Sequence, residues 1–318
     1  MLNPVQPVLF ETQANPIPPG TEGGHVRDRG GKRIRYALVP TDSATPRGTV
    51  LVLPGRNEAI EKYWETARDL SRRGFCALIL DWRGQGGSDR LLRDAERGYV
   101  QDFAHYVDDL RIVFDEVALP RAPAPFFVLG HSTGSLVALL AAPLFGGEIR
   151  RMVLGSALLQ ISGFSLAHPG IRRLSRVVSG MGLGRLYLGG GPRRGRELSF
   201  ARNPLTHDDK RFARNVELLH SHPQLGLGGP TAAWVHAACA AIERVHQPEF
   251  ISAMRIPTLF VAAGADRIVS SRAIEVYAPR LRAGALVTID GASHELAQES
   301  DHFREQWLAA FDAFVPGT

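Results

Sequence analysis

The feature that most constrains the fold of this chain is a short apolar run that ends in a glycine-flanked serine. Residues 126–140 read FFVLGHSTGSLVALL, and the pattern Gly-x-Ser-x-Gly spans residues 130–134. The apolar residues before it predict a buried strand, and those after it predict a buried helix. A serine at the apex of such a turn is held in a strained conformation, and the glycines leave its hydroxyl clear. Ser132 is therefore the candidate nucleophile, and the alternative is a tight turn without a catalytic role.

Apolar strands alternate with amphipathic helices on both sides of this unit. Strands that are apolar on both faces belong in the middle of a parallel sheet covered by helices. The pattern therefore predicts a mostly parallel, doubly wound α/β sheet. We expect further strands over residues 48–55, 76–82, 150–157, 256–266 and 285–295, an antiparallel hairpin over 23–40, and helices over 58–73, 99–117 and from about Ser300.

The alternation stops for about ninety residues after Ala157. Residues 158–250 lack buried strand patterns and contain loops rich in Gly, Pro and Arg, together with a helix opened by Thr206 and another over 231–245. We therefore expect an α/β core formed by residues 1–157 and 251–318, interrupted by a helical cap over residues 158–250.

Composition and the N-terminus give expectations about compartment. The chain has 318 residues, of which 44% are hydrophobic and 22% charged, as in a globular protein. Its first twenty residues lack the basic start and apolar core of a signal peptide, and no segment has the length of a membrane span, so a cytoplasmic protein is expected. Cys76 and Cys239 lie in separate apolar segments with no metal-ligand or redox spacing, which predicts two buried thiols.

Positive charge is concentrated in one segment. Residues 171–214 contain 11 Arg and Lys against 3 Asp and Glu, whereas the formal charge of the whole chain is only +5. One interpretation is a solvated, Arg-rich face. The other is peripheral contact with an anionic membrane surface or a lipid phosphate, in which Arg193, Arg194 and Arg196 would take part. Nucleic acid is not an expected partner, because no binding motif accompanies the charge.

A nucleophilic serine needs an imidazole to accept its proton and a carboxylate to orient that imidazole. In an open parallel sheet these groups lie at the carboxyl ends of strands. Asp266 ends the strand predicted over 256–266, and His294 follows the stretch ALVTID. The chain order Ser, Asp, His is that of an α/β-hydrolase triad. We therefore predict Ser132, Asp266 and His294 as the catalytic residues.

Other histidines and aspartates compete for these roles. His131 adjoins the serine, but the turn directs its side chain away, so a packing role is expected. His302 opens the last predicted helix and is the nearest rival to His294. Asp290 precedes a turn, and Asp81 is expected to organise the loop RGQGGS over residues 83–88.

A tetrahedral intermediate also needs hydrogen-bond donors for its negative oxygen. The backbone N–H of Thr133, directly after the serine, is one candidate donor. The loop that follows the strand GTVLVLP supplies the other, and its position indicates the backbone N–H of Arg56. The side chains of Arg56 and Glu58 are then free to line the mouth of the site or to lie on the surface.

With these residues placed, the chain from about residue 30 resembles the α/β-hydrolase superfamily, and in particular its bacterial lysophospholipase and monoacylglycerol lipase branch. The most specific segments are LPGRNEAIEKYWETARDL, LDWRGQGGSDR, GHSTG, NPLTHDD, GGPTAAW, GADRIV and SHELAQESD. Pro54-Gly55-Arg56 departs from the His-Gly start of many hydrolase oxyanion loops but is similar to the lysophospholipase-like branch. The resemblance implies the same triad and oxyanion residues, and it implies no metal or organic cofactor.

These observations predict a serine carboxylic-ester hydrolase that acts through an acyl-enzyme on a small lipid with one acyl chain, either a lysophospholipid or a monoacylglycerol. A broad esterase or a serine peptidase of the same fold is the alternative within enzymes. A catalytically silent ligand-binding relative is the alternative from another class.

Overall fold

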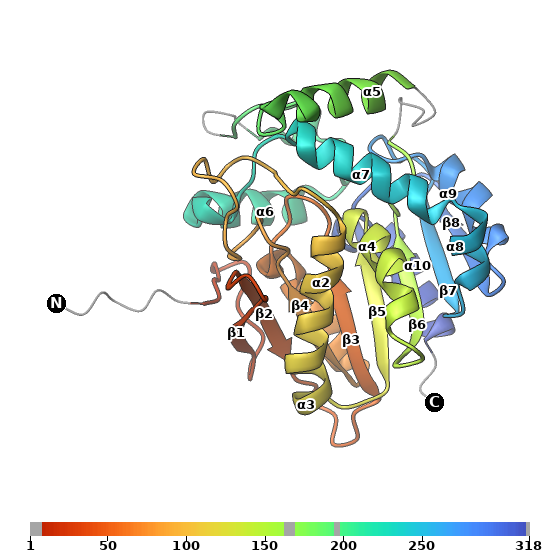
Figure 1. Ribbon diagram of the computed structural model, residues 1–318. Coiled ribbons are helices and arrows are strands. Elements are labelled where there is room, and N and C mark those ends of the chain that lie inside the picture. The colour runs from red at the N-terminus through yellow and green to blue at the C-terminus, as the bar shows by residue number, and fades with distance from the viewer. Residues whose placement is uncertain (1–7, 162–168, 194–197, 316–318) are drawn as a thin grey trace.

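In the computed structural model of the protein, residues 8–161, 169–193 and 198–315 are described, and their strands form one twisted sheet (Figure 1). The strand order is β1-β2-β4-β3-β5-β6-β7-β8. The strands are β1 (Glu22–Arg27), β2 (Arg33–Val39), β3 (Gly48–Leu53), β4 (Phe75–Leu80), β5 (Phe126–His131), β6 (Ile149–Gly155), β7 (Thr258–Ala263) and β8 (Gly284–Ile289).

The pairing of these strands confirms the predicted mostly parallel sheet. β1 and β2 form the expected antiparallel hairpin, β2 pairs antiparallel with β4, and the pairs from β4 through β3 to β8 are parallel. The register pairs Leu53 with Gly130 and His131 with Gly155. Because β3, β5 and β6 are parallel, the loops that leave their carboxyl ends lie side by side at one edge of the sheet.

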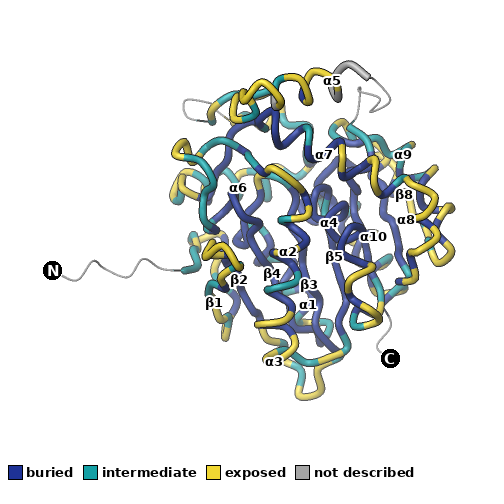
Figure 2. The backbone as a smooth tube through the Cα atoms, in the orientation of Figure 1, coloured by how far each residue is buried: buried dark blue, intermediate teal, exposed yellow. Residues whose placement is uncertain are grey.

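Helices cover both faces of the sheet, as a doubly wound sheet requires. On β3, Leu51 and Leu53 pack on the same side as α2 (Ala104–Val113) and α4 (Thr133–Ala141), and Val50 and Val52 pack on the side of α1 (Trp64–Arg72) and α10 (Asp301–Phe314). This alternation follows the two-residue period of a strand. Figure 2 shows the result as a buried sheet between more exposed helices. The remaining helices outside the insert are the short α3 (Leu119–Arg121) and α9 (Ser271–Tyr277).

Three predicted helices differ from the structure at their starts. The helix expected over 58–73 is α1, which begins at Trp64 after a 3₁₀-helical turn over Ile60–Tyr63. The helix expected over 99–117 begins only at Ala104 and ends in a π-helical turn over Phe114–Ala118. The helix expected to open at Thr206 is α6 (Asp209–Ser221), and the Asp208 side chain caps it by accepting the backbone N–H of Arg211. A carboxylate is at least as good an N-cap as a threonine hydroxyl, so the later start prevails.

Four helices lie between β6 and β7 in the described residues of this region: α5 (Pro169–Val178), α6, α7 (Ala232–Val245) and α8 (Pro248–Ala253). We call the chain between these strands, residues 156–257, the insert. Figure 1 shows α5 and α7 stacked beyond the carboxyl ends of the strands. The division into a core of residues 1–157 and 251–318 with a cap over 158–250 stays a prediction. In the described part of the chain, no helix combines the length and apolarity needed to cross a membrane.

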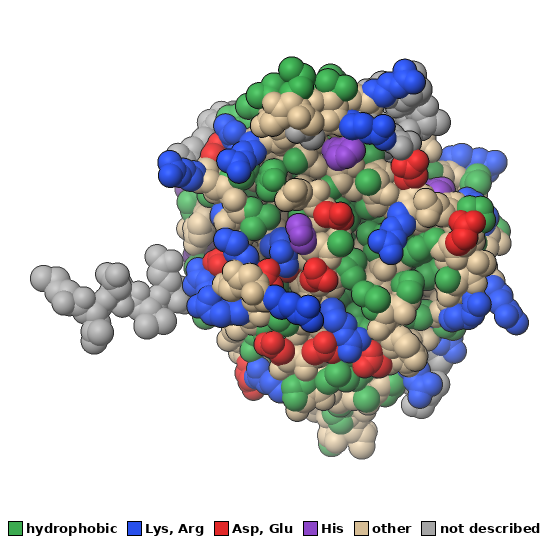
Figure 3. All heavy atoms as spheres, in the orientation of Figure 1, with side chains coloured by type: hydrophobic (Ala, Val, Ile, Leu, Met, Phe, Trp, Pro, Cys, Tyr) green, Lys and Arg blue, Asp and Glu red, His purple; other side chains and the backbone are tan. Residues whose placement is uncertain are grey.

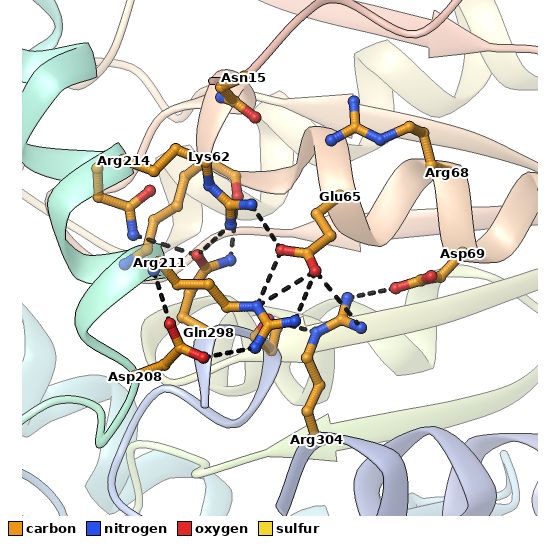
Figure 4. Close-up of polar contacts among 12 residues, drawn as sticks. Asn15, Lys62, Glu65, Arg68, Asp69, Asp208, Arg211, Arg214, Gln298 and Arg304 are labelled. Carbon is orange, nitrogen blue, oxygen red and sulfur yellow. Dashed lines mark hydrogen bonds and ion pairs between the residues drawn. The ribbon is translucent and has the colours of Figure 1, made fainter. Parts of the chain in front are cut away.

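A cluster of ion pairs joins the insert to the core around Glu65 of α1 (Figure 4). The Glu65 carboxylate lies 2.7 Å from Arg211 and 2.7 Å from Arg214, both on α6, and 4.0 Å from Arg304 of α10. Burial alone would raise the pKa of Glu65, but its arginine partners outweigh burial and lower that pKa to about 2. Arg304 also pairs with Asp69 of α1. Glu65 therefore ties three helices from distant parts of the chain.

We expect Glu65→Gln to lower the free energy of unfolding by roughly 1–2 kcal/mol at neutral pH, after allowance for solvent screening of this partly exposed group. Because the folded-state pKa lies below the ordinary value of 4.5, this stabilisation is present above pH 4.5 and is lost as the pH falls from 4.5 towards 2. Urea unfolding of the wild type and the variant at pH 7 and pH 3.5 measures it. Glu217→Gln, on the exposed side of α6, is the control and should change stability little. Equal stability of wild type and Glu65→Gln at pH 7 would contradict this role.

Candidate active site

Ser132 occupies a strained turn between β5 and α4. Its backbone has φ 50° and ψ −111°, a conformation that residues with side chains rarely adopt. The turn is held on both sides, because the Ser132 N–H donates to the Gly155 carbonyl of β6 at 3.0 Å and the Ser132 carbonyl accepts the N–H of Leu158 at 3.2 Å. The conformation predicted for the candidate nucleophile is therefore present.

The two motif glycines are required by close packing around this turn. A Cβ atom on Gly134 would collide with the carbonyl oxygen of Leu53, at the end of β3. A Cβ atom on Gly130 would lie 3.0 Å from the Cα atom of Ser135. Helix α4 thus starts directly against the end of the neighbouring strand, and this places Ser132 beside the loop after β3.

His294 and Asp266 come together after β8 and β7, as predicted. The Nδ1 atom of His294 lies 2.7 Å from Oδ2 of Asp266. Because a carboxylate oxygen only accepts, Nδ1 carries a proton, and Nε2 is the ring nitrogen left to exchange one. Burial opposes ionisation of Asp266, but its hydrogen bond and charge interaction with His294 and the backbone N–H groups of Val269 and Ile268 lower its pKa below the usual range.

The backbone of His294 is anchored to the last residue of β5, directly before Ser132, and to the residue that follows β6. Its carbonyl accepts a hydrogen bond from the Ser156 hydroxyl at 2.8 Å and lies 3.2 Å from Nε2 of His131. The preceding Ser293 donates its N–H to the buried carboxylate of Glu299 at 2.7 Å. These contacts fix the histidine loop against the turn that carries Ser132.

Ser132, His294, Thr133 and Arg56 line one cavity of about 350 Å³. Asp266 lies behind His294 with a fully buried side chain. The cavity wall is largely apolar, and most of its apolar part comes from the insert. The apolar lining residues are Ala59, Leu158, Ile161, Leu198, Leu205, Phe212, Val216, Leu218, Leu219, Trp234 and Ile268.

The loop after β3 is held rigidly at the cavity. Trp82 donates its indole N–H to the Pro54 carbonyl at 2.8 Å, and the Gly55 N–H donates to the carboxylate of Glu58. Asn57 has φ 62°, donates its N–H to Gln85 at 2.7 Å and accepts the N–H of Leu227 from the insert. The loop that carries Arg56 is therefore fixed from both the core and the insert.

Glu58 is a buried anion that lines the cavity, which is one of the two placements expected for it, and it does not lie on the surface. Besides the Gly55 N–H, its carboxylate accepts the Tyr63 hydroxyl and pairs with Lys62 at 2.8 Å and with His131 at 3.1 Å. Burial would raise the pKa of Glu58, but His131 and Lys62 hold it well below its usual value. Gly55, Lys62 and Tyr63 lie within five residues of Glu58, whereas His131 comes from β5, and its contact with Glu58 could not be read from local spacing.

His131 does more than the packing predicted for it, because both of its ring nitrogens make polar contacts. Its two ring nitrogens face the Glu58 carboxylate and the His294 carbonyl, and both of these are acceptors. Both nitrogens must then donate, which requires the charged imidazolium. Burial opposes this charge, but Glu58 outweighs burial and raises the pKa of His131 above its ordinary value. His131 thus links the loop after β3 to the histidine loop.

The rival candidates lie away from the cavity. His302 and Asp290 are exposed. Asp81 is buried, pairs with Arg35 and accepts the N–H of Gly87 at 2.7 Å, which is the loop-organising role expected of it. Both cysteines are buried, as predicted. Among the described residues, no three His, Cys, Asp or Glu side chains form a group that could hold a metal ion.

The mostly parallel sheet with helices on both faces is the fold of the α/β-hydrolases. Residues 44–301 match the protein family described as Serine aminopeptidase, S33. Lysophospholipase L2 of Escherichia coli (strain K12) is 34% identical over 286 residues, which cover 83% of this chain and 79% of the relative. Monoglyceride lipase of Homo sapiens is 26% identical over 266 residues, covering 81% of this chain and 78% of the relative.

A similar solved structure is that of a soluble variant of monoglyceride lipase from Saccharomyces cerevisiae, with a TM-score of 0.74 at 18% identity over 97% of this chain and 98% of that one. The chain belongs to the S33 hydrolase family, in the lysophospholipase and monoglyceride lipase branch of the α/β-hydrolases. The resemblance and the fold class inferred from the sequence are confirmed.

Proposed function

We propose that the protein is a serine hydrolase that cleaves the carboxylic ester of a lipid with one acyl chain, a lysophospholipid or a monoacylglycerol. The observation that carries the proposal is the 2.7 Å contact of His294 with Asp266 behind a cavity that Ser132 and His294 both line. The strained conformation of Ser132 and the branch to which the chain belongs support it.

In the proposed reaction, the hydroxyl of Ser132 attacks the ester carbonyl and Nε2 of His294 accepts its proton. The backbone N–H groups of Arg56 and Thr133 stabilise the oxyanion, and each such donor is worth roughly 3–4 kcal/mol in comparable sites. The alcohol leaves with the proton from His294, and water then attacks the acyl-enzyme with the same imidazole as base. Asp266 holds the tautomer and stabilises the imidazolium. This proposal needs no metal or organic cofactor.

The apolar wall supplied by the insert supports an acyl-chain substrate. Side chains of α6 and α7, including Phe212, Val216 and Trp234, line the cavity together with Leu158 and Ile161, which follow β6. A long acyl chain buried there gains about 0.8 kcal/mol for each methylene removed from water. In this proposal the predicted cap over residues 158–250 acts as the lid that covers the chain.

A peptidase of the same fold is less well supported. An aminopeptidase needs a carboxylate free to bind the α-amine of its substrate. The cavity is lined by two glutamates, but Glu58 is already bound to Lys62 and His131, and Glu295 pairs with Lys62 at 2.6 Å. Both carboxylates are therefore occupied by cations of the protein.

We expect Ser132→Ala to fold normally and to lose roughly 10⁴ to 10⁶ in kcat on monooleoylglycerol and on oleoyl lysophosphatidylcholine, because the nucleophile is removed. Release of oleate measures turnover, and circular dichroism checks the fold. Acyl esters of graded length and an aminoacyl anilide complete the panel and separate esterase from peptidase activity. Undiminished ester turnover in a folded Ser132→Ala protein would refute the nucleophile, and absence of turnover in the wild type would favour a silent binding protein.

We also propose that the insert contacts an anionic membrane surface. Exposed apolar side chains gather on and after α5, and Figure 3 shows this apolar area at the top of the molecule with basic side chains beside it. Apolar side chains flanked by arginines are typical of interfacial binding. The apolar members are Leu174, Val177, Met181, Leu183 and Leu186, and the exposed arginines among them are Arg173, Arg176 and Arg185.

The arginines first considered for this role fit it less well. Arg193 is partly buried, and its Nη2 donates to the Leu219 carbonyl at 3.3 Å. Arg194 and Arg196 lie outside the described residues. Arg211 and Arg214 are engaged by Glu65. Part of the positive charge of residues 171–214 is thus buried or paired within the protein, and the exposed arginines lie around α5.

The double variant Val177→Asp, Met181→Asp should lose binding to vesicles of phosphatidylcholine and phosphatidylglycerol, because it puts negative charge into the apolar area. Vesicle flotation at low and high salt measures binding, and binding by the wild type should fall with salt. Leu119→Asp is the matched control, since Leu119 is 46% exposed on α3 at the opposite end of the molecule. Wild-type binding that the double variant leaves intact would contradict the proposed contact.

A further inference from the structure

Two cationic side chains of the cavity are paired with carboxylates of the described residues, and a third is not. Lys62 lies 2.8 Å from Glu58 and 2.6 Å from Glu295, and His131 is bound to Glu58. Arg56 also lines the cavity, yet among the described residues it forms no ion pair with a carboxylate. The cavity therefore carries one cation whose charge no side chain described there neutralises. An uncompensated buried cation costs free energy, so its presence calls for a reason.

The guanidinium of Arg56 is held in place by neutral groups of the core and the insert. Its Nη2 donates to the Gly228 carbonyl, and its Cζ lies 5.4 Å from the ring centroid of Trp234. A Cβ atom on Gly98 would overlap Nη2, so the packing leaves room for the arginine there. Its Nε is buried without a hydrogen-bond partner among the described atoms. The side chain is thus preorganised, and its Nε is an unused donor.

The charge of Arg56 persists at neutral pH. Burial lowers the pKa of Arg56 to about 10, and no carboxylate offsets that effect. At pH 7 the side chain is still almost fully protonated. It can therefore offer a full positive charge and planar donors, which suit the oxygen atoms of a phosphate.

The two ends of Arg56 match the two ends of a glycerophosphate ester. The backbone N–H of Arg56 is the proposed donor to the ester carbonyl, and the guanidinium lies at the far end of its side chain. The path from its backbone N to Cζ has the same number of covalent bonds as the path from the ester carbonyl carbon to the phosphorus of a lysophospholipid, roughly 7 Å when extended. One residue can thus meet both the carbonyl and the phosphate.

We propose that the side chain of Arg56 forms a subsite for the phosphate of the substrate head group and makes the protein select lysophospholipids over monoacylglycerols. This inference rests on the proposed ester hydrolysis and adds the head group to it. A monoacylglycerol has no charge to offer Arg56, so the cation stays uncompensated in that complex. A lysophospholipid supplies the missing anion through charge-assisted hydrogen bonds.

The test compares kcat/KM for oleoyl lysophosphatidylcholine with kcat/KM for monooleoylglycerol, both in mixed micelles of a neutral detergent. Arg56→Met keeps the backbone N–H and removes the charge, so the ratio of the two values should fall about 10-fold to 100-fold. Arg56→Lys restores a charge without the planar fork and should recover part of that ratio. A ratio that Arg56→Met leaves unchanged would overturn the subsite.

Arg90→Met is the matched control for a merely structural role. Arg90 also ties the core to the same part of the insert, donating to the carbonyls of Gln224 at 2.6 Å and Gly226 at 3.3 Å, but it does not line the cavity. We expect Arg90→Met to leave the ratio unchanged. If Arg90→Met lowered it as much as Arg56→Met, the effect would come from loosening the insert, and the proposal would fail.

Binding of glycerophosphocholine, followed by isothermal calorimetry, separates this proposal from the proposed hydrolysis. The wild type and Ser132→Ala should bind it equally, and Arg56→Met should weaken the binding at least 10-fold, with Arg90→Met as the control. Arg56-dependent binding without turnover of either lipid would support the subsite and reject the hydrolase. If both lipids were turned over, and Arg56→Met changed neither the kcat/KM ratio nor the binding constant for glycerophosphocholine, the result would support the hydrolase and reject the subsite.

Discussion

The positive φ of Ser132 is the constraint on which the rest of the site depends. This conformation survives because the backbone of the turn is bonded to Gly155 and Leu158, and because Gly134 lets α4 start against Leu53. Strain of this kind costs about 1–3 kcal/mol and persists only where the surrounding structure over-determines it. The parallel register of β3, β5 and β6 fixes these neighbours, so the sheet itself places Ser132 at the wall of the cavity.

The charged pair of Glu58 and His131 extends this constraint to the other loops. Glu58 holds the N–H of Gly55, and His131 holds the carbonyl of His294, so the pair joins the loop after β3, the serine turn and the histidine loop. Glu58 is buried and His131 nearly so, and both ring nitrogens and the carboxylate have hydrogen-bond partners, which is the condition under which a polar network rigidifies a structure. Proposed catalysis by Ser132 requires this rigidity, because displacements of about 1 Å at a reacting centre are costly.

Much of this architecture could be predicted from the sequence because it depends on local patterns. Apolar strands, helical stripes and the glycine-flanked serine are visible within short windows, and Asp266 and His294 could be selected by their positions after predicted strands and by their order in the chain. Helix starts were less predictable, since Asp208 rather than Thr206 provides the cap. The roles of Glu58 and of the Arg56 side chain were out of reach, because each depends on partners more than twenty residues away in the chain, including His131 and Gly228.

In the proposed mechanism, the imidazole of His294, oriented by the carboxylate of Asp266, activates Ser132. Reaction with a fluorophosphonate, followed by proteolysis and peptide mass mapping, tests it most directly, because only an activated serine reacts rapidly with this reagent. The proposed triad predicts a single adduct on Ser132 in the wild type and a loss of most labelling in His294→Ala. An unlabelled wild type, an adduct on another residue, or undiminished labelling of Ser132 without His294 would contradict it.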